Sequence, residues 1–484
     1  MSKRSVLAAC IIAAIATTSA SAQLRGTVSG VVGGLRGTVS NVGNTVGSTV
    51  GGPVGNTVNN VTGAVDSGLG KVSRPGSSWG GFALTGTRLR EPSDSSASED
   101  VEPISLNNVT GYLDGQAKTP EEIDDLRQAR LRELINSNRK VLDRDGEGQP
   151  VRRNELIACD PDATSLAAAQ HAGFRIIGFE PRNMLGVTIV RLATPRGMNV
   201  RKGLAALRKL APNLQSDYNH VFEPAGAALL PAIGATLASR VALRPGTRIA
   251  MIDGGVASHP SLAAANIEQR GFVGDPQPTG HGTAVGSLLV GSQGPFRGAA
   301  RGAQLFVADV YGGNPASGSA TAIVQALAWA ASKQPKVINI SLVGPSNRSV
   351  ERAINAVRAR GIAVVAAVGN DGPAAPPQYP ASYPGVIAVT GVDAADRALI
   401  EAGVSHHLDF AAPGADLVAA LPGAGYTPVR GTSFAAPFVA ARLAATGSTA
   451  RLAAEVAPGK GKVGQGIICR TCRVLPKMVG LNIK

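Results

Sequence analysis

Aromatic side chains and long apolar runs are scarce in this chain of 484 residues, although 47 lysines and arginines give it a formal charge of +14. Aromatic residues make up only 4% of it, and the basic residues are scattered. A stacking platform and a basic stripe are therefore missing, which argues against nucleic-acid binding. No run after the N-terminal segment reaches the roughly 18 apolar residues that span a bilayer. We interpret the charge as a source of solubility or of attraction to acidic cell surfaces.

Cysteine is also rare, with four in the whole chain. Cys10 lies in the N-terminal apolar segment and Cys159 stands alone, whereas Cys469 and Cys472 form a CRTC pair. One such pair cannot by itself make a four-ligand zinc site. Outside the cytosol a local disulfide between Cys469 and Cys472 is the natural state, so we expect that bond and no redox catalysis.

The first 22 residues have the pattern of a secretory signal. Lys3 and Arg4 precede the apolar run VLAACIIAAIA, and the small residues TTSASA follow it, which predicts cleavage after Ala22 and a secreted or periplasmic protein. The LAAC sequence at residues 7–10 also imitates a lipid-attachment box. The apolar stretch before its cysteine is too short for a signal core, which favours ordinary secretion.

Residues 23–118 are predicted to be a low-complexity Gly/Val/Thr tract followed by a polar linker. In residues 26–66 the apolar residues recur every three or four positions, near the helical period. Many glycines, Pro53 and β-branched residues oppose a helix. A flexible spacer is the favoured interpretation, and a segment that folds on a membrane or partner is the alternative. The Ser-rich stretch at 88–100 continues the linker.

Residues 119–224 have a different character. In TPEEIDDLRQARLRELINSNRK, Thr119 is a capping residue with proline at the first helical position and Glu122 three residues later, which predicts a helix start. Strand and helix patterns then follow in the order βαββαβ and end in DYNHVF, which is typical of a small α+β ferredoxin-like domain. The small-residue segment 225–247 is predicted to be a linker.

Residues 248–470 alternate continuously apolar strands, such as RIAMID and KVINISL, with helical stretches, such as SVERAINAVRAR. This alternation predicts an α/β domain with a doubly wound, mostly parallel sheet covered by helices. Ligands of such sheets meet the carboxyl ends of the strands. The last residues, 471–484, are predicted to be a tail.

Three short motifs carry side chains suited to catalysis. Asp253 directly follows the strand RIAMI, His281 stands between glycines in GHGTAVGSLLVG, and Ser433 stands at a helix start in RGTSFAAPFVAA. Taken singly, each has an ordinary alternative: an Asp-Gly turn, a structural histidine and a helix cap. A helix N-terminus, however, favours negative charge, which suits a nucleophile whose attack creates an oxyanion.

Together these motifs resemble those of the subtilisin-like serine peptidases, the subtilase family (peptidase S8). The resemblance covers roughly residues 245–470 and extends to the βαββαβ unit, which is similar to the family's inhibitory propeptide of the I9 type. It implies a subtilisin-like fold and the catalytic residues Asp253, His281 and Ser433. It also implies Asn370, in AAVGNDG, as an oxyanion donor, and the substrate-binding residues Ser341, Leu342, Val343 and Gly344.

The chemistry of these residue types agrees with the resemblance. His281 would accept the proton of Ser433 and pass it to the leaving amine, while Asp253 would hold the imidazole tautomer. The backbone N–H of Ser433 and the amide of Asn370 would meet the oxyanion. The implied protein is a secreted serine endopeptidase made as a self-processing zymogen. Its partners are protein or peptide substrates and its own propeptide, and it needs neither a metal nor another cofactor.

The sequence departs from the family at Gly254, where serine or threonine is usual, so a hydrogen bond near the Asp253 carboxylate is expected to be missing. The catalytic domain is short, and calcium-binding loops are not expected. His259, His406 and His407 lie outside the motifs and are predicted to be surface or loop residues.

Two rival functions follow from the same residues. An inactive subtilisin-like scaffold could serve as a surface binding or adhesion module, although the full set of catalytic residue types argues against decay. A lipase or esterase would require a Gly-x-Ser-x-Gly elbow, and Ser433 lies in GTSFA instead.

Overall fold

The computed structural model describes residues 119–228, 243–244, 246–423 and 425–479. The predicted signal, the lipid-box alternative, the low-complexity tract and the polar linker lie outside these residues, as does most of the predicted linker at 225–247. Within the described residues, no helix combines the length and the apolar character needed to cross a membrane.

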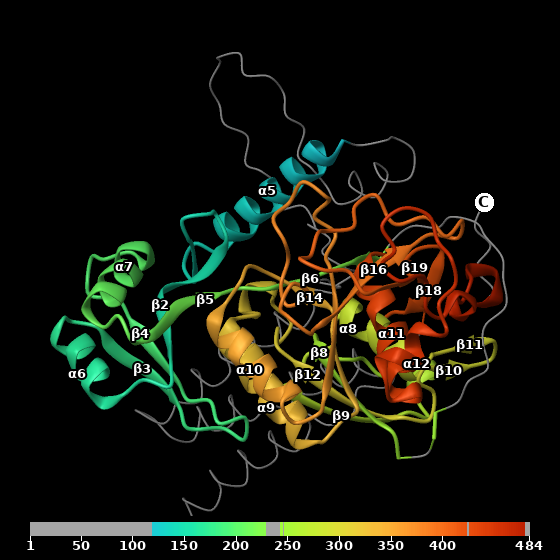
Figure 1. Ribbon diagram of the computed structural model, residues 1–484, viewed down its shortest axis with the longest axis horizontal. Helices are drawn as coiled ribbons and strands as arrows, with labels where there is room; N and C mark the ends of the chain where they lie inside the picture. The colour runs from blue at the N-terminus through green and yellow to red at the C-terminus, as the bar shows by residue number, and fades with distance from the viewer. Residues whose placement is uncertain (1–118, 229–242, 245, 424, 480–484) are drawn as a thin grey trace, which may run out of the picture. The chain divides into compact units, whose positions relative to one another are not determined.

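A seven-stranded sheet forms the centre of the described region after residue 246 (Figure 1). Every neighbouring pair in it is parallel, in the order β17-β16-β15-β13-β8-β12-β9, which confirms the predicted α/β sheet. The strands are β8 (Arg248–Asp253), β9 (Asn266–Gly271), β12 (Gln304–Asp309), β13 (Val337–Ile340), β15 (Ala363–Ala367), β16 (Ile387–Val392) and β17 (Phe410–Pro413).

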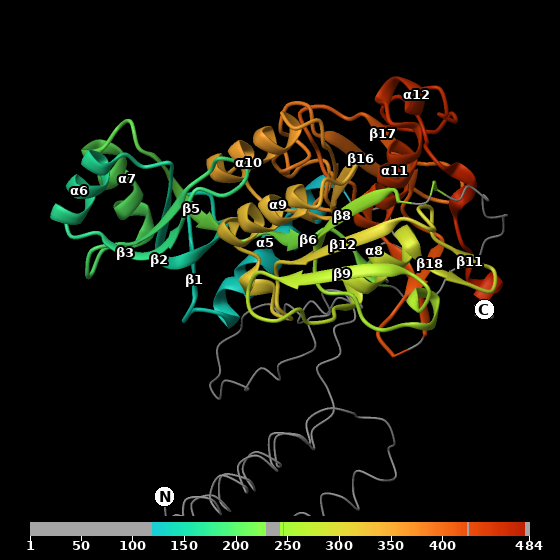
Figure 2. The same cartoon turned by 90° about the horizontal axis from the view of Figure 1, so that it is seen from below.

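Helices cover both faces of this sheet because its strands are apolar on both sides. Along β8, Ile249 and Met251 pack in the core that contains α8 (Gly280–Val290) and α11 (Thr432–Thr446). The alternate residues of β8 belong to the core on the other face. That face is covered by α9 (Ala320–Ser332) and α10 (Arg348–Arg358), as Figure 2 shows.

The region before the sheet contains a four-stranded unit with two helices, and the predicted βαββαβ order is confirmed. Its strands lie in the order β3-β4-β2-β5, all antiparallel, and a short strand β1 also pairs with β2. The elements are β1 (Leu142–Arg144), β2 (Pro150–Cys159), α6 (Ala163–His171), β3 (Arg175–Glu180), β4 (Ile189–Ala193), α7 (Val200–Leu210) and β5 (Gln215–His220). Leu156, Phe174 and Leu204 belong to its small core.

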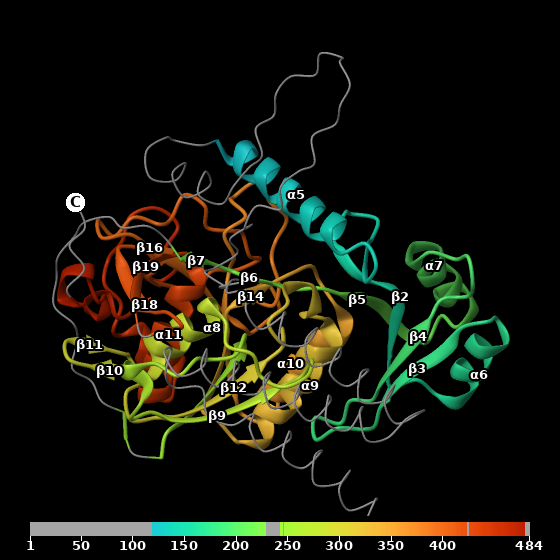
Figure 3. The same ribbon diagram turned by 180° about the vertical axis from the view of Figure 1, so that it is seen from behind.

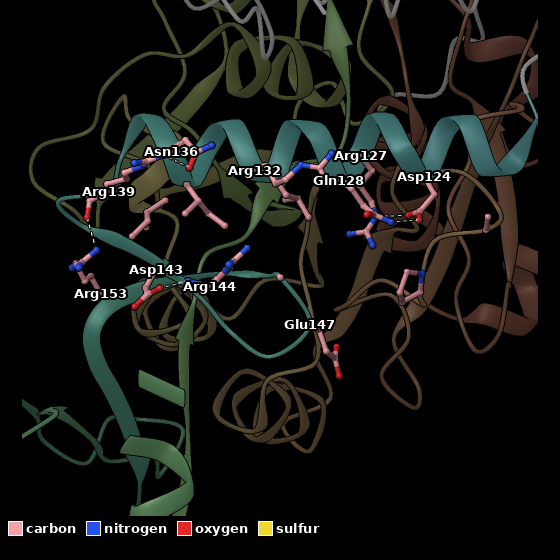
Figure 4. Close-up of a pocket in the computed structure, with 16 residues that line it drawn as sticks. Asp124, Arg127, Gln128, Arg132, Asn136, Arg139, Asp143, Arg144, Glu147 and Arg153 are labelled. Atoms are coloured by element: carbon pink, nitrogen blue, oxygen red, sulfur yellow. Dashed lines mark hydrogen bonds and ion pairs between the residues drawn. The ribbon is translucent and has the colours of Figure 1, made fainter. Parts of the chain in front are cut away.

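Helix α5 (Pro120–Ser137) precedes this unit and begins as predicted. The Thr119 side chain accepts a hydrogen bond from the backbone of Glu122, whose carboxylate accepts one from the backbone of Thr119. Ile123, Leu131 and Leu134 are buried along the helix. Figure 4 shows α5 above a pocket whose opposite wall is the β1–β2 hairpin, including Asp143, Arg144 and Arg153.

After β5 the chain continues in an extended form across the catalytic region (Figures 1 and 3). β6 (Glu223–Pro224) pairs antiparallel with β14 (Leu342–Val343), and β7 (Ala227–Ala228) pairs antiparallel with β19 (Tyr426–Arg430). Two strands of the catalytic domain therefore hold the segment, one on each side of residues 225 and 226.

The C-terminal part packs on the catalytic domain. Cys469 and Cys472 form the predicted disulfide, with their Cα atoms 5.2 Å apart, while Cys159 is a buried free cysteine. The backbone N–H of Val418 donates to the carbonyl of Val474, which ties the segment to β18. The remaining short elements are β10 (Ser292–Gln293), β11 (Phe296–Arg297), β18 (Leu417–Ala420), α12 (Thr449–Ala453), η1 (Pro260–Leu262), η2 (Pro315–Ser317), η3 (Arg470–Cys472) and η4 (Pro476–Val479).

Candidate active site

Asp253 and His281 lie together at the carboxyl end of β8. Asp253 is the last residue of the strand, and His281 is in the first turn of α8, which Thr279 caps. His281 Nδ1 lies 2.8 Å from Asp253 Oδ1, and the two residues are only 3% and 1% exposed. Because the carboxylate accepts, Nδ1 carries the proton and Nε2 of a neutral ring is left as a base. Nε2 is buried without a hydrogen-bond partner among the described residues.

The other groups around Asp253 leave its carboxylate incompletely bonded. Oδ1 also accepts from the Gly254 N–H at 2.6 Å, whereas Oδ2 has no partner in the described part of the chain. A Cβ on Gly254 would lie 2.2 Å from Thr279 Oγ1. Thr279 therefore occupies the space that a larger residue after Asp253 would need, which accounts for glycine at this position.

Ser433 lies in the first turn of α11, where its backbone N–H has no partner within the helix. This N–H donates instead to the carbonyl oxygen of Ala225 at 2.9 Å. The Ser433 hydroxyl donates to the carbonyl of Ser341 at 3.0 Å and therefore not to His281. The ring of the next residue, Phe434, lies against the His281 ring, with centroids 5.4 Å apart.

Asn370 follows β15 and approaches the same helix start. Its Oδ1 accepts from the Thr432 N–H at 2.9 Å, which directs Nδ2 away from that bond. A Cβ on Gly431 would lie 2.7 Å from Asn370 Nδ2 and 3.2 Å from the Ala225 oxygen. Gly431 has φ of 137°, a conformation that favours glycine. The missing side chain thus leaves the space between the Asn370 amide and the Ala225 carbonyl open.

Residues 341–344 hold the extended segment that follows β5. The Ala225 N–H donates to the Ser341 carbonyl at 3.1 Å, and Leu342 and Val343 form the β14 ladder with β6. Gly344 faces the Phe222 ring, since a Cβ there would lie 2.5 Å from Cδ1 of the ring. Phe222 is completely buried. The four predicted substrate-binding residues therefore contact a segment of the chain itself.

An ion cluster that the sequence analysis did not identify adjoins this segment. Arg130 Nη2 of α5 lies 3.2 Å from Glu223 Oε2 and 2.8 Å from Asp371 Oδ1. Burial raises the pKa of the Glu223 carboxyl, and the nearby Arg130 charge only partly opposes this rise. Burial alone would lower the pKa of Arg130, but Glu223 and Asp371 together raise it. The sequence contained one signal for this cluster: the acidic residue Asp371 directly follows Asn370, which had been identified as a site residue.

The three other predicted loop histidines have different surroundings. His259 is a loop residue, one of the two predicted alternatives, but it is not at the surface, since it is only 3% exposed: its Nδ1 lies 2.8 Å from Ser261 Oγ and its Nε2 lies 3.0 Å from the Gly425 carbonyl. His406 lies in a loop beside Tyr379, and His407 contacts the Val386 carbonyl. His259 caps η1, since its Nδ1 accepts from the Ser261 N–H at 3.0 Å, and the Tyr426 ring packs against its own ring.

Among the described residues, no three or more His, Cys, Asp or Glu side chains form a group that could hold a metal ion. The arrangement at Asp253, His281 and Ser433 is one of acid, base and hydroxyl, which supports acyl-transfer chemistry.

Residues 244–454 match the model of the Subtilase family, Peptidase_S8. The chain is 36% identical over 203 residues to subtilisin Savinase of Lederbergia lenta, a match that covers 40% of this chain and 74% of that protein. The chain belongs to the subtilase family. The subtilase also matches thermitase of Thermoactinomyces vulgaris, with 34% identity over 44% of this chain and 78% of thermitase.

A solved structure has a similar fold. Fervidolysin from Fervidobacterium pennivorans, described as a keratinolytic enzyme related to subtilisin, superposes with a TM-score of 0.56 and 18% identity. That match covers 69% of this chain and 62% of fervidolysin, and it bears on the fold alone. The family membership identifies the subtilase as a serine endopeptidase.

Proposed function

We propose that this subtilase is an exported endopeptidase that is made as a zymogen and cleaves its own chain between Ala225 and Gly226. One observation carries the proposal. The carbonyl oxygen of Ala225 accepts from the Ser433 N–H, and the Ala225 N–H donates to Ser341. The bond that follows Ala225 thus has the hydrogen bonds expected of a substrate held for attack by Ser433.

In this proposal His281 is the general base and Asp253 orients it. The Ser433 hydroxyl would turn from the Ser341 carbonyl toward His281 Nε2, which has no hydrogen-bond partner among the described residues. Hydrogen bonds of this kind are often unformed before the transition state. Attack on the Ala225 carbonyl carbon passes the hydroxyl proton to Nε2, and the ring then protonates the amine of Gly226 as the peptide bond breaks.

The oxyanion would form where the Ala225 oxygen already lies. The Ser433 N–H is in place at 2.9 Å, and the Asn370 amide borders the same space beside Gly431. The positive end of the α11 dipole points to this space and favours the developing negative charge. An acyl-enzyme at Ala225 would then be hydrolysed by water in the reverse sequence of proton transfers.

The propeptide role of residues 119–224 follows from the same contacts. β6 lies beside β14 in the manner of a bound peptide, and Phe222 fills the space next to Gly344. After cleavage, this strand would remain bound as a product and inhibit the enzyme until the propeptide is removed. Export and removal of the first 22 residues are part of this proposal, as are protein or peptide substrates.

The experiment compares the full chain with Ser433→Ala, both expressed in a host without other secreted proteases. We expect the wild type to yield a chain that begins at Gly226, identified by N-terminal sequencing, and the variant to accumulate uncleaved. Ser332→Ala, which alters a serine at the end of α9, serves as the matched control and should be processed like the wild type. Normal processing of Ser433→Ala would disprove self-cleavage.

A fluorophosphonate probe distinguishes the enzyme from an inactive scaffold. We expect the processed wild type to be labelled at Ser433, because the probe requires a hydroxyl activated by a neighbouring base. Absence of labelling in correctly folded protein would favour the scaffold that acts only as a binding module.

A further inference from the structure

Glu223 is the third residue before the proposed cleavage site, and its position is defined by the β6–β14 ladder. It pairs with Val343, while Pro224 pairs with Leu342. Glu223 is only 5% exposed. A substrate bound in the same register would therefore place its third residue before the cleaved bond beside Val343.

Asp371 supplies a second carboxylate at this position. It directly follows Asn370 and is itself 5% exposed. A single nitrogen, Arg130 Nη2, bridges the carboxylates of Glu223 and Asp371. No other hydrogen-bond or ion-pair partner of the Asp371 side chain occurs among the described residues. Two buried carboxylates that both contact one nitrogen are close enough to repel each other, and the cation between them offsets this repulsion.

The bridging cation does not come from the catalytic domain. Arg130 belongs to α5, which precedes the βαββαβ unit, and it reaches Asp371 across 241 positions of sequence. If α5 and the propeptide leave together, Arg130 and Glu223 leave with them. The Asp371 carboxylate then remains in the substrate cleft without its cation, and an unpaired charge in such a place favours a cationic ligand.

We propose that Asp371 determines substrate specificity in the released enzyme by selecting lysine or arginine three residues before the cleaved bond and rejecting glutamate or aspartate there. This inference rests on the proposed function and on its cleavage site. Lysine and arginine are longer than glutamate, so their charged ends can replace the Arg130 guanidinium beside Asp371 directly. The chain's own Glu223 is acceptable in the precursor because Arg130 neutralises it.

The first test uses the enzyme that the full chain releases after processing. Three fluorogenic peptides carry the sequence Phe-Xaa-Pro-Ala of residues 222–225 before the leaving group, with Xaa as lysine, glutamine or glutamate. We expect kcat/KM to fall in that order, with a ratio of lysine to glutamate of about tenfold or more at low salt. The ratio should shrink as ionic strength rises, because the cleft is open to ions once α5 has left.

The second test alters the acid itself. Asp371→Asn keeps the side-chain volume and should bring the ratio of lysine to glutamate to within about twofold of unity, whereas Asp371→Lys should reverse the order. The ratio is independent of any general loss of activity in these variants. Glu268→Gln removes an equal charge from the edge strand β9 and should keep the wild-type ratio.

The outcomes separate this inference from the function on which it rests. Equal hydrolysis of the three peptides by the wild type would overturn the role of Asp371 and leave the peptidase intact. No hydrolysis of any peptide by processed enzyme would overturn the proposed function and the specificity with it. The wild-type comparison and its salt dependence remain decisive even where a variant at position 371 does not fold.

Discussion

The backbone N–H of Ser433 donates to the carbonyl oxygen of Ala225 at 2.9 Å, although 207 residues lie between them in the sequence. This contact joins the start of α11 to the extended segment after the βαββαβ unit. It is the contact on which the proposed self-cleavage depends, and it makes the consequences of several substitutions predictable.

Replacing Asn370 with leucine is expected to slow turnover with little change in substrate binding. The substitution keeps the volume but removes the amide donor beside the Ala225 oxygen. The expected loss in kcat is about 10²–10³, a magnitude that comes from the corresponding change in subtilisin itself and not from this structure. Steady-state kinetics on a peptide substrate measures it. Asn355→Leu, on the exposed face of α10, is the control, and full turnover in Asn370→Leu would make Asn370 a turn residue only.

Replacing Phe222 with alanine is expected to weaken the packing of the extended segment after β5 on the region that contains Ser433. Phe222 is completely buried against Gly344, and a buried Phe→Ala change costs about 3–5 kcal/mol. In the Ser433→Ala background, which stays uncleaved, we expect a lower free energy of unfolding in urea. Phe179 is 59% exposed, so Phe179→Ala removes the same ring but should lower the free energy of unfolding much less. Similar losses for both variants would contradict the buried role of Phe222.

Acid is expected to weaken the precursor through Asp145. Burial raises the pKa of this carboxyl, but hydrogen bonds from His220 and from the backbone of Gln149 and Glu147 outweigh burial and hold the pKa below its ordinary value. The folded state then binds fewer protons than the unfolded state. The resulting stabilisation is present above the ordinary aspartate pKa of about 3.9 and is lost as the pH falls through the lowered pKa.

The contribution of Asp145 can be measured by thermal unfolding of the uncleaved Ser433→Ala chain. The pH should be lowered in steps from 6 to about two units below the ordinary aspartate pKa. Asp145→Asn should be less stable than its parent near pH 6, and the difference should narrow in acid. Asp143→Asn, on the same hairpin but more exposed, is the matched control. A difference that stays constant with pH would show that the Asp145 charge does not contribute.

Breaking the Cys469–Cys472 disulfide is expected to loosen the C-terminal segment. The bond closes a very short loop, for which chain entropy predicts a stabilisation of about 2 kcal/mol. Val474 pairs with Val418 of the catalytic domain, so the double serine variant should unfold at a lower temperature. Differential scanning calorimetry with and without reductant measures the effect, and mass spectrometry of unreduced protein that finds two free thiols would show that the bond does not form.

The released domain is expected to bind acidic surfaces in a salt-dependent way. Residues 225–484 contain 22 Lys and Arg and 12 Asp and Glu, a difference of 10. Retention on anionic vesicles should fall as salt rises above about 0.15 M, where the screening length is about 8 Å. Salt-independent retention would point to apolar contacts instead.

Much of this fold could be predicted from the sequence because its signals are local. The apolar runs that became β8 and β13, the capping pattern at Thr119 and the βαββαβ order each depend on residues close together in the chain. The approach of Asp253 to His281 was implied by the resemblance to the subtilase family, because the sequence pattern itself placed only Asp253 at the carboxyl end of a strand. The division of the chain into signal, linkers and domains stays a prediction.

The register at the site was decided by the tertiary structure. The sequence indicated only a linker at 225–247, and it was the pairing of β6 with β14 and of β7 with β19 that placed Ala225 beside Ser433. The burial of His259 likewise depends on the fold, because Gly425 comes to its ring from 166 positions away.

The sequence by itself determined the local elements and the order of the chemically active side chains, because periodicity, capping and turn residues act over a few positions. Only the tertiary structure decided which charges meet. Arg130 lies on α5, Glu223 on β6 and Asp371 in the loop after β15, and no local pattern links them. Their cluster forms because α5 lies against the loop after β15, where Ile123 meets Gly372, and the cost of burying a charge requires that an opposite charge be found nearby.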